Sequence, residues 1–189
     1  MILKPDHSRR HFITGLASSV TGALLLPAAP SAMAAVVTSG RQTGRSLSFY
    51  HTHSGDRLAI DYHDGNDYVS GALAEINHYM RDFRTEESYP IDAALLDYLH
   101  ELKTATGHNG TFEVISGYRS PKTNAKLRSK SNGVAKRSLH MQGKAIDVRL
   151  TGFDTSQLHK AARKLAKGGV GYYQKSNFIH IDTGRVRYW

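Results

Sequence analysis

Two segments of the sequence combine an aliphatic face with ionisable side chains. In a strand predicted over residues 145–150, alternation places Asp147 on the face opposite the isoleucine, valine and leucine side chains. A second predicted strand has the same pattern, and its polar face carries His180 and Asp182. His140 lies in a glycine-containing turn just before the first strand. If the two strands pair, the side chains of His140, Asp147 and His180 can converge.

Two imidazoles and one carboxylate are a recurrent ligand set for catalytic zinc, which takes three protein ligands and leaves a fourth position for water. Zinc in such a site lowers the pKa of its bound water to about 7 and polarises a carbonyl, so an amide can be hydrolysed without a nucleophilic side chain. The sequence contains no cysteine, so a metal site must use histidine and carboxylate ligands. Each residue alone also has a structural interpretation, because a single histidine on a strand is more often a surface or core residue than a ligand. Asp147 alone could belong to a turn or a salt bridge.

The spacing of apolar residues predicts the elements that must position these side chains. Helices are predicted over residues 67–83, 91–106, 121–129 and 155–167, and strands over 47–53, 57–63, 111–115, 145–150, 170–173 and 178–183. The first two strands form a hairpin in this prediction. The order of the elements favours an α+β domain with a small, mainly antiparallel sheet packed with helices. The sequence has no glycine-rich phosphate loop, so nucleotide chemistry is not indicated.

The first 34 residues have the features of a secretory leader. A basic start precedes an apolar stretch, and Ala32-Met33-Ala34 matches an A-x-A cleavage site. The start includes Ser8-Arg9-Arg10-His11-Phe12-Ile13, which resembles the twin-arginine export signal. We therefore predict a twin-arginine signal peptide over residues 1–34, a flexible lead-in over 35–44 and a folded domain over 45–189. An uncleaved anchor is the alternative, but the apolar stretch is diluted by glycine, serine and proline, and a spanning helix needs roughly 20 predominantly apolar residues.

The composition is that of a soluble globular protein with a basic surface. Hydrophobic residues make up 40% and charged residues 22% of the 189 residues, and the formal net charge is +9. A basic surface alone would suggest a nucleic-acid partner. Export to the periplasm argues against that partner and points instead to anionic cell-wall peptides. The basic segment over residues 122–137 is interpreted as one rim of a cleft that attracts their carboxylates.

The segment from Ser138 to Asp147 reads S-x-H-x-x-G-x-A-x-D. It resembles the motif of the zinc D-alanyl-D-alanine carboxypeptidase and murein endopeptidase family, whose fold is shared with the Hedgehog signalling domain. Residues 116–119 (SGYR) resemble a second segment of that family, and His180 fits its third ligand. The resemblance implies a Hedgehog-like zinc peptidase domain over residues 45–189, with one zinc ion bound by His140, Asp147 and His180.

The resemblance also implies roles beside the metal. Arg119 would lie over the site and hold a substrate carbonyl or carboxylate, for which its planar guanidinium is suited. Ser138 would orient the ligand loop or contact substrate. Tyr172 and Tyr173 follow a glycine-rich turn and either line the cleft or pack in the core, and we take Tyr172 as the substrate contact.

The general base is the point where the sequence departs from the family pattern. Many members place an acidic residue three positions before the last histidine ligand, or a histidine two positions before it. Here those positions hold Asn177 and Phe178. The nearest acidic residue on the same predicted face is Asp182, which either takes a proton from the zinc-bound water or anchors a ligand or Arg119 from behind.

The expected function is that of a periplasmic zinc metallopeptidase that hydrolyses peptide cross-links of peptidoglycan. Its expected partners are peptidoglycan stem peptides and, for the precursor, the twin-arginine export machinery. Neither a nucleic-acid partner nor a stable membrane anchor is expected. The alternatives are a D,D- or L,D-carboxypeptidase and a non-catalytic, zinc-containing module that binds the cell wall.

Overall fold

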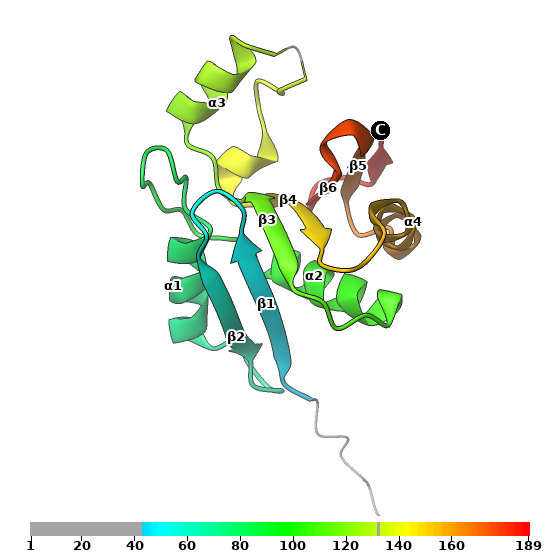
Figure 1. Cartoon of the computed structure of the whole chain (residues 1–189). Helices are drawn as coiled ribbons and strands as arrows, with labels where there is room; N and C mark the ends of the chain where they lie inside the picture. The colour runs from blue at the N-terminus through cyan, green and yellow to red at the C-terminus, as the bar shows by residue number, and fades with distance from the viewer. Residues whose placement is uncertain (1–42, 132) are drawn as a thin grey trace, which may run out of the picture. The chain divides into compact units, whose positions relative to one another are not determined.

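The computed structural model describes residues 43–131 and 133–189. The predicted signal peptide and most of the predicted lead-in lie outside these residues. The described chain forms seven strands and four α-helices, which Figure 1 shows. They are β1 (Arg45–His51), β2 (Arg57–His63), α1 (Ser70–Tyr79), α2 (Ala93–Thr106), β3 (Phe112–Ser116), α3 (Pro121–Arg128), β4 (Ala145–Leu150), α4 (Thr155–Leu165), β5 (Gly169–Tyr173), β6 (Phe178–Asp182) and β7 (Arg187–Tyr188).

The strands form one sheet in the order β2-β1-β3-β4-β6-β5-β7. Four neighbouring pairs are antiparallel, and only β1 with β3 and β5 with β7 run parallel. The predicted α+β class with a mainly antiparallel sheet is therefore confirmed. β4 and β6 are direct neighbours, and Asp147 lies opposite His180 in their register. The side chains of Asp147 and His180 can converge only if β4 and β6 pair, and the structure shows this pairing.

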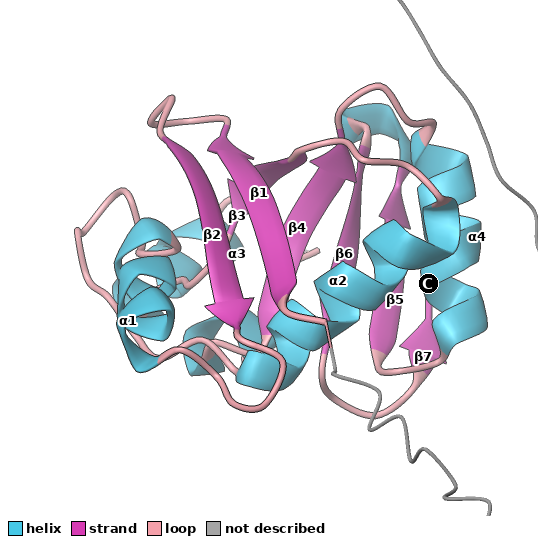
Figure 2. Ribbon diagram, turned by 90° about the horizontal axis from the view of Figure 1, so that it is seen from below, coloured by secondary structure: helices cyan, strands magenta, loops and turns pink. Residues whose placement is uncertain are grey.

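Helices α1, α2 and α4 pack against the sheet, and α2 and α4 cover the face opposite the ionisable residues. Figure 2 shows α2 running across the sheet with α4 beside it, near β5 and β7. Leu99 of α2, Val148 of β4 and Ile179 of β6 belong to one buried apolar cluster. Because side chains alternate along a strand, Asp147 and His180 face away from this core. The hydrophobic effect thus fixes which way both candidate ligands point.

Two of the predicted helices end two or more residues earlier in the structure than predicted. The helix predicted over residues 67–83 is confined to α1, because the chain then turns around the buried carboxylate of Asp82. That carboxylate accepts hydrogen bonds from the backbone N–H groups of Arg84 (3.1 Å) and Ser120 (2.9 Å). α4 ends at Leu165 rather than at 167, and its N-terminus is capped by Asp154, which accepts from the N–H of Gln157 (2.9 Å).

Gly143 controls the entry into β4. It ends a short 3₁₀ helix, η1 (Leu139–Gln142), with a left-handed backbone (φ 63°). A Cβ at this position would overlap the carbonyl oxygen of Pro90. The carbonyl of Gly143 also accepts a hydrogen bond from the N–H of Asp92 (3.0 Å) at the start of α2. The turn that carries His140 is therefore held against α2 in a way that only glycine permits.

We expect Gly143→Ala to lower the free energy of unfolding by about 2–5 kcal/mol, because the left-handed backbone costs about 1–2 kcal/mol and the overlap about 1–3 kcal/mol more. Gly55→Ala is the matched control. Gly55 also has a positive φ (80°), but no atom lies within 4 Å of the position its Cβ would take. Urea unfolding of both variants measures the difference, and equal losses would contradict the role given to the overlap.

Candidate metal centre

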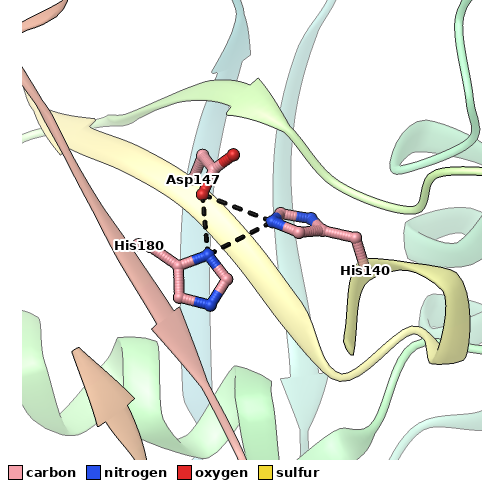
Figure 3. Close-up of side chains that lie close together, drawn as sticks. All are labelled: His140, Asp147 and His180. Carbon is pink, nitrogen blue, oxygen red and sulfur yellow. Dashed lines mark hydrogen bonds and ion pairs between the residues drawn. The ribbon is translucent and has the colours of Figure 1, made fainter. Parts of the chain in front are cut away.

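Three side chains from separate segments meet on the polar face of the sheet. His180 Nδ1 lies 2.9 Å from Asp147 Oδ1, and His140 Nε2 lies 3.3 Å from the same oxygen. The two ring nitrogens are 3.2 Å apart. Figure 3 shows the three atoms pointing toward one another from β4, β6 and η1. Among the described residues, this is the one cluster of three histidine or carboxylate groups with metal-ligand spacing.

The spacing fits a tetrahedral cation. Zinc binds imidazole nitrogen and carboxylate oxygen at about 2.0–2.1 Å, and two ligands at the tetrahedral angle are then separated by about 3.3 Å. The three separations in the structure are 2.9, 3.2 and 3.3 Å. A donor set of two nitrogens and one oxygen also suits zinc better than calcium or magnesium, which prefer oxygen ligands. The residues predicted as ligands thus lie together, and their binding of a metal stays a prediction.

His140 is oriented by the backbone of the SGYR segment. Its side chain is buried, and its Nδ1 lies 2.7 Å from the carbonyl oxygen of Gly117. A carbonyl oxygen only accepts, so Nδ1 carries the proton and Nε2 presents a lone pair to the centre. The N–H of Arg119 donates to the carbonyl of His140 (3.2 Å), which ties the two loops together.

Asp182 holds His180 from the side away from the centre. Its Oδ2 lies 2.9 Å from Nε2 of His180, and its side chain has no exposed surface. The backbone N–H groups of Gly169 (3.1 Å) and Gly184 (2.9 Å) donate to Oδ1. Arg187 donates to both oxygens, at 3.0 and 2.7 Å. The carboxylate therefore fixes the ring so that Nδ1 faces Asp147.

Arg119 lies against the other oxygen of Asp147. Its Nη2 is 3.5 Å from Asp147 Oδ2 and donates to Ser116 Oγ at 3.3 Å. Its Nε is buried and has no hydrogen-bond partner among the described residues. The side chain also lines the cavity in front of the three ligand atoms. Its fixed guanidinium at the cavity lining is what a group that binds a substrate oxygen needs.

The candidate centre opens into a cavity of about 440 Å³. Its lining includes the predicted Ser138, and Arg137 from the basic segment, but none of the lysines of that segment. Tyr173 and Phe178 line it as well, and their rings stack with centres 4.7 Å apart. Asp147 supplies the one carboxylate among the described lining residues.

Tyr172, the tyrosine predicted to contact substrate, is not among the described residues that line the cavity. Tyr172 pairs with Ile179 across β5 and β6, so its side chain faces the helices and stacks on His159 of α4 with ring centres 5.0 Å apart. Tyr173, one position on, faces the cavity. The alternation of β5 relative to the isoleucines of β6 was the signal that could have distinguished the two tyrosines.

Burial and hydrogen bonding shift the pKa values of the cluster in opposite directions. Burial would lower the pKa of His180, but its hydrogen bonds to Asp147 and Asp182 outweigh burial and raise the pKa to about 9. Burial alone would raise the pKa of Asp147, but the neighbouring imidazoles hold it well below its usual range. Burial lowers the pKa of His140. Without a cation, the proton on His180 balances the charge of Asp147.

A model of the family described as "Peptidoglycan L,D-endopeptidase MepK" matches residues 39–189. The chain belongs to this peptidase family. The Escherichia coli K12 protein "Peptidoglycan L,D-endopeptidase MepK" is 39% identical over 186 residues, which cover 98% of this chain and 99% of the relative. The Haemophilus influenzae protein "Probable peptidoglycan L,D-endopeptidase MepK" is 39% identical over 185 residues, covering 97% and 96%. The resemblance inferred from the motif is thereby confirmed.

The family assignment makes the chain a peptidase. The cavity in front of the three candidate ligands is therefore the candidate active site. Within residues 43–131 and 133–189, no helix is both long enough and apolar enough to cross a membrane. Asp182 and Trp189 lie against His180, and Arg187 pairs with Asp182. Of these, the sequence drew attention only to Asp182, because Arg187 and Trp189 belong to no periodic segment.

Zinc binding to the metal-free protein should release about one proton from His180 at pH 7.5, in addition to the proton that zinc-bound water with a pKa of about 7 gives up in part. The raised pKa of His180, about 9, means that both of its ring nitrogens are protonated at this pH, and a cation must displace the proton on Nδ1. The apparent affinity should therefore rise with pH up to about pH 9. Calorimetric titration in buffers of different ionisation enthalpy measures the released proton.

Asp182→Asn provides the comparison for this titration. The substitution removes one of the two carboxylates that raise the pKa of His180, so the variant should release fewer protons at pH 7.5 than the unsubstituted protein. Proton release that is absent in the unsubstituted protein, or identical in the variant, would contradict the arrangement described for His180.

Proposed function

We propose that this protein is a periplasmic zinc metallopeptidase that hydrolyses peptide cross-links of peptidoglycan. The observation that carries the proposal is the convergence of His140 Nε2, Asp147 Oδ1 and His180 Nδ1 within 3.3 Å of one another at the base of an open cavity. Membership of the peptidase family supports the reaction type. The names of the relatives, peptidoglycan L,D-endopeptidases, support the substrate.

Zinc is the proposed metal because the donor set and the separations suit it. When bound, zinc lowers the pKa of water and polarises a carbonyl, which is the chemistry that amide hydrolysis needs. Asp147 and His180 come from paired strands, and His140 from a turn pinned by Gly143. A ligand set held by rigid elements keeps its geometry during turnover.

Arg119 is proposed to bind the carbonyl oxygen of the cleaved amide. Negative charge develops on this oxygen during hydrolysis, and a positioned guanidinium stabilises it. Removing one such donor typically costs about 10²–10³ in kcat. The salt bridge to Asp147 and the hydrogen bond to Ser116 orient the group, and its side chain lines the cavity.

Asp182 is proposed as a positioning residue and not as the general base. Its two oxygens already take part in five hydrogen bonds, and its side chain has no exposed surface. A general base must reach the proton that it removes, directly or through one water. The alternative role considered for Asp182, that of anchoring His180 from behind, fits these contacts.

Two variants should separate metal binding from catalysis. His140→Ala is expected to lose both zinc and the cleavage of purified sacculi, because it removes a ligand and leaves two. Arg119→Met is expected to keep stoichiometric zinc and to lose cleavage by about 10²–10³-fold, since it removes only the oxygen-binding group. Zinc content by atomic absorption and products by mass spectrometry are the measurements.

The control is Arg149→Met, which removes an arginine of the same sheet that pairs with Glu113 away from the cavity. Chelator should abolish cleavage by the unsubstituted protein. Full activity of His140→Ala would refute the proposal. Removal of terminal D-alanine from monomers without splitting of cross-linked dimers would identify a carboxypeptidase, and wall binding with unchanged muropeptides would identify a binding module.

The first 34 residues are proposed to direct export through the twin-arginine pathway. The proposal rests on Arg9-Arg10 and the Ala32-Met33-Ala34 site, with residues 35–44 as the lead-in to a zinc peptidase domain over 45–189. The exported protein should begin at Ala35, and replacing both arginines by lysine should retain the precursor in the cytoplasm. Immunoblots of periplasmic fractions and N-terminal sequencing measure this.

Arg41→Lys is the matched control for export, because Arg41 lies outside both the paired arginines and the apolar stretch. It should be exported normally. Export of the double lysine variant at the unsubstituted level would contradict the assignment to the twin-arginine pathway.

A further inference from the structure

Trp189 forms one wall of the cavity that contains the candidate metal ligands. It is 50% exposed and lines the cavity together with Tyr173 and Phe178. The centre of its indole ring lies 5.3 Å from that of His180. A large aromatic side chain contributes strongly to binding when a ligand buries its face, and here half of that surface is available.

The indole is held in place by contacts within the protein. The backbone N–H of Trp189 donates to Val170 O (3.2 Å), and its carbonyl accepts from the N–H of Tyr172 (3.0 Å). The indole Nε1 donates to the hydroxyl of Tyr173 (3.1 Å). The guanidinium of Arg187 lies 5.0 Å from the ring centre. Because the side chain is ordered in advance, little conformational entropy is lost when a ligand packs on it.

Gly171 keeps the space under the indole free. It lies opposite His180 in the pairing of β5 with β6, so it faces the same side of the sheet. A Cβ at this position would stand 2.5 Å from Cε2 of Trp189. Any larger residue would push the indole out of the cavity wall. The absence of a side chain at Gly171 thus brings the aromatic ring next to the candidate centre.

The same cavity carries positive charge beside the aromatic wall. Arg119, Arg137 and Arg187 line it, and Asp147 supplies the one carboxylate among the described lining residues. Arg119 and Arg187 are paired with carboxylates, whereas Arg137 is exposed and has no salt bridge to a described residue. An aromatic face next to a guanidinium suits a ligand that has an aliphatic chain and a carboxylate.

We propose that Trp189 determines substrate specificity by packing its indole against the aliphatic side chain of a residue next to the cleaved bond, while Arg137 binds a carboxylate of the same substrate. The inference rests on the proposed function, because peptidoglycan stem peptides supply acidic residues of this kind. Trp189 contacts substrate in this proposal and takes no part in proton transfer or metal binding.

A purely structural role for Trp189 makes a different prediction. Through its contact with Arg187, the indole could act on Asp182 and so on the orientation of His180. Loss of the indole would then weaken zinc binding. A substrate-binding role leaves zinc binding intact and changes KM instead.

The test compares Trp189→Ala, Trp189→Phe and Tyr188→Ala in the zinc-loaded protein with soluble cross-linked muropeptide dimers as substrate. Tyr188 is the matched control, because it is the neighbouring residue of the same region but its hydroxyl donates to Arg163 O of α4, away from the cavity. Trp189→Ala should raise KM about tenfold or more with kcat and zinc content nearly unchanged. Trp189→Phe should recover most of that loss, and Tyr188→Ala should behave as the unsubstituted protein.

Fluorescence provides a readout that does not depend on turnover. The sequence contains one tryptophan, so indole emission reports on this wall alone. Monomeric muropeptides, the products of cleavage, should change the emission of the zinc-loaded protein saturably. Arg137→Gln should shift that titration to about tenfold higher concentration, as expected for the loss of a charge-assisted contact.

Several outcomes would overturn the inference. An unchanged KM for Trp189→Ala, loss of zinc from that variant, or an emission spectrum that saturating muropeptide does not alter would each do so. If the unsubstituted protein cleaved no muropeptide at all, the proposed function would fail and this inference with it. Normal cleavage by both Trp189→Ala and the unsubstituted protein would refute the inference alone.

Discussion

The candidate centre depends on the buried carboxylate of Asp182 behind His180. A buried charge that loses its partners destabilises a protein by about 3–5 kcal/mol, so a carboxylate with no exposed surface must be fully paired. Its partners are the N–H groups of Gly169 and Gly184, the guanidinium of Arg187 and the ring of His180. These partners come from β5, β6, β7 and the turn between the last two. Pairing one charge therefore fixes three strands around one candidate ligand.

The other side of the centre is held by the backbone rather than by charge. The carbonyl of Gly117 orients His140, and the N–H of Arg119 ties the loop after β3 to the 3₁₀ turn before β4. Gly117 must itself be glycine, since a Cβ there would stand 2.7 Å from Met80 O. Two independent supports thus meet at Asp147 on β4. These supports bring three residues distant in sequence close to tetrahedral spacing.

The sequence alone predicted the helices and strands in which apolar residues recur at regular spacing. The alternation of aliphatic and ionisable residues identified β4 and β6. Because the aliphatic side chains of each strand are buried, Asp147 and His180 must lie on the opposite face of the sheet. Alternation could not identify β7, which has only two residues, or the position of Trp189, which follows from the missing side chain of Gly171. The choice of Tyr172 over Tyr173 was made without aligning β5 with β6, and this register decides which tyrosine faces the cavity.

The charges around the centre indicate that a cation would bind at Asp147 before Arg119 interacts with a substrate. Arg119 pairs with Asp147 and Arg187 with Asp182, so in the absence of a cation each guanidinium is partly neutralised by a carboxylate. A divalent cation at Asp147 would take over the neutralisation of that carboxylate and leave the charge of Arg119 for an oxygen of the substrate. Positive charges in a partly enclosed cavity act more strongly than in water, because screening is weaker there. Metal binding would then increase the attraction for an anionic peptide, and the aromatic wall at Trp189 would select among the peptides that this charge attracts.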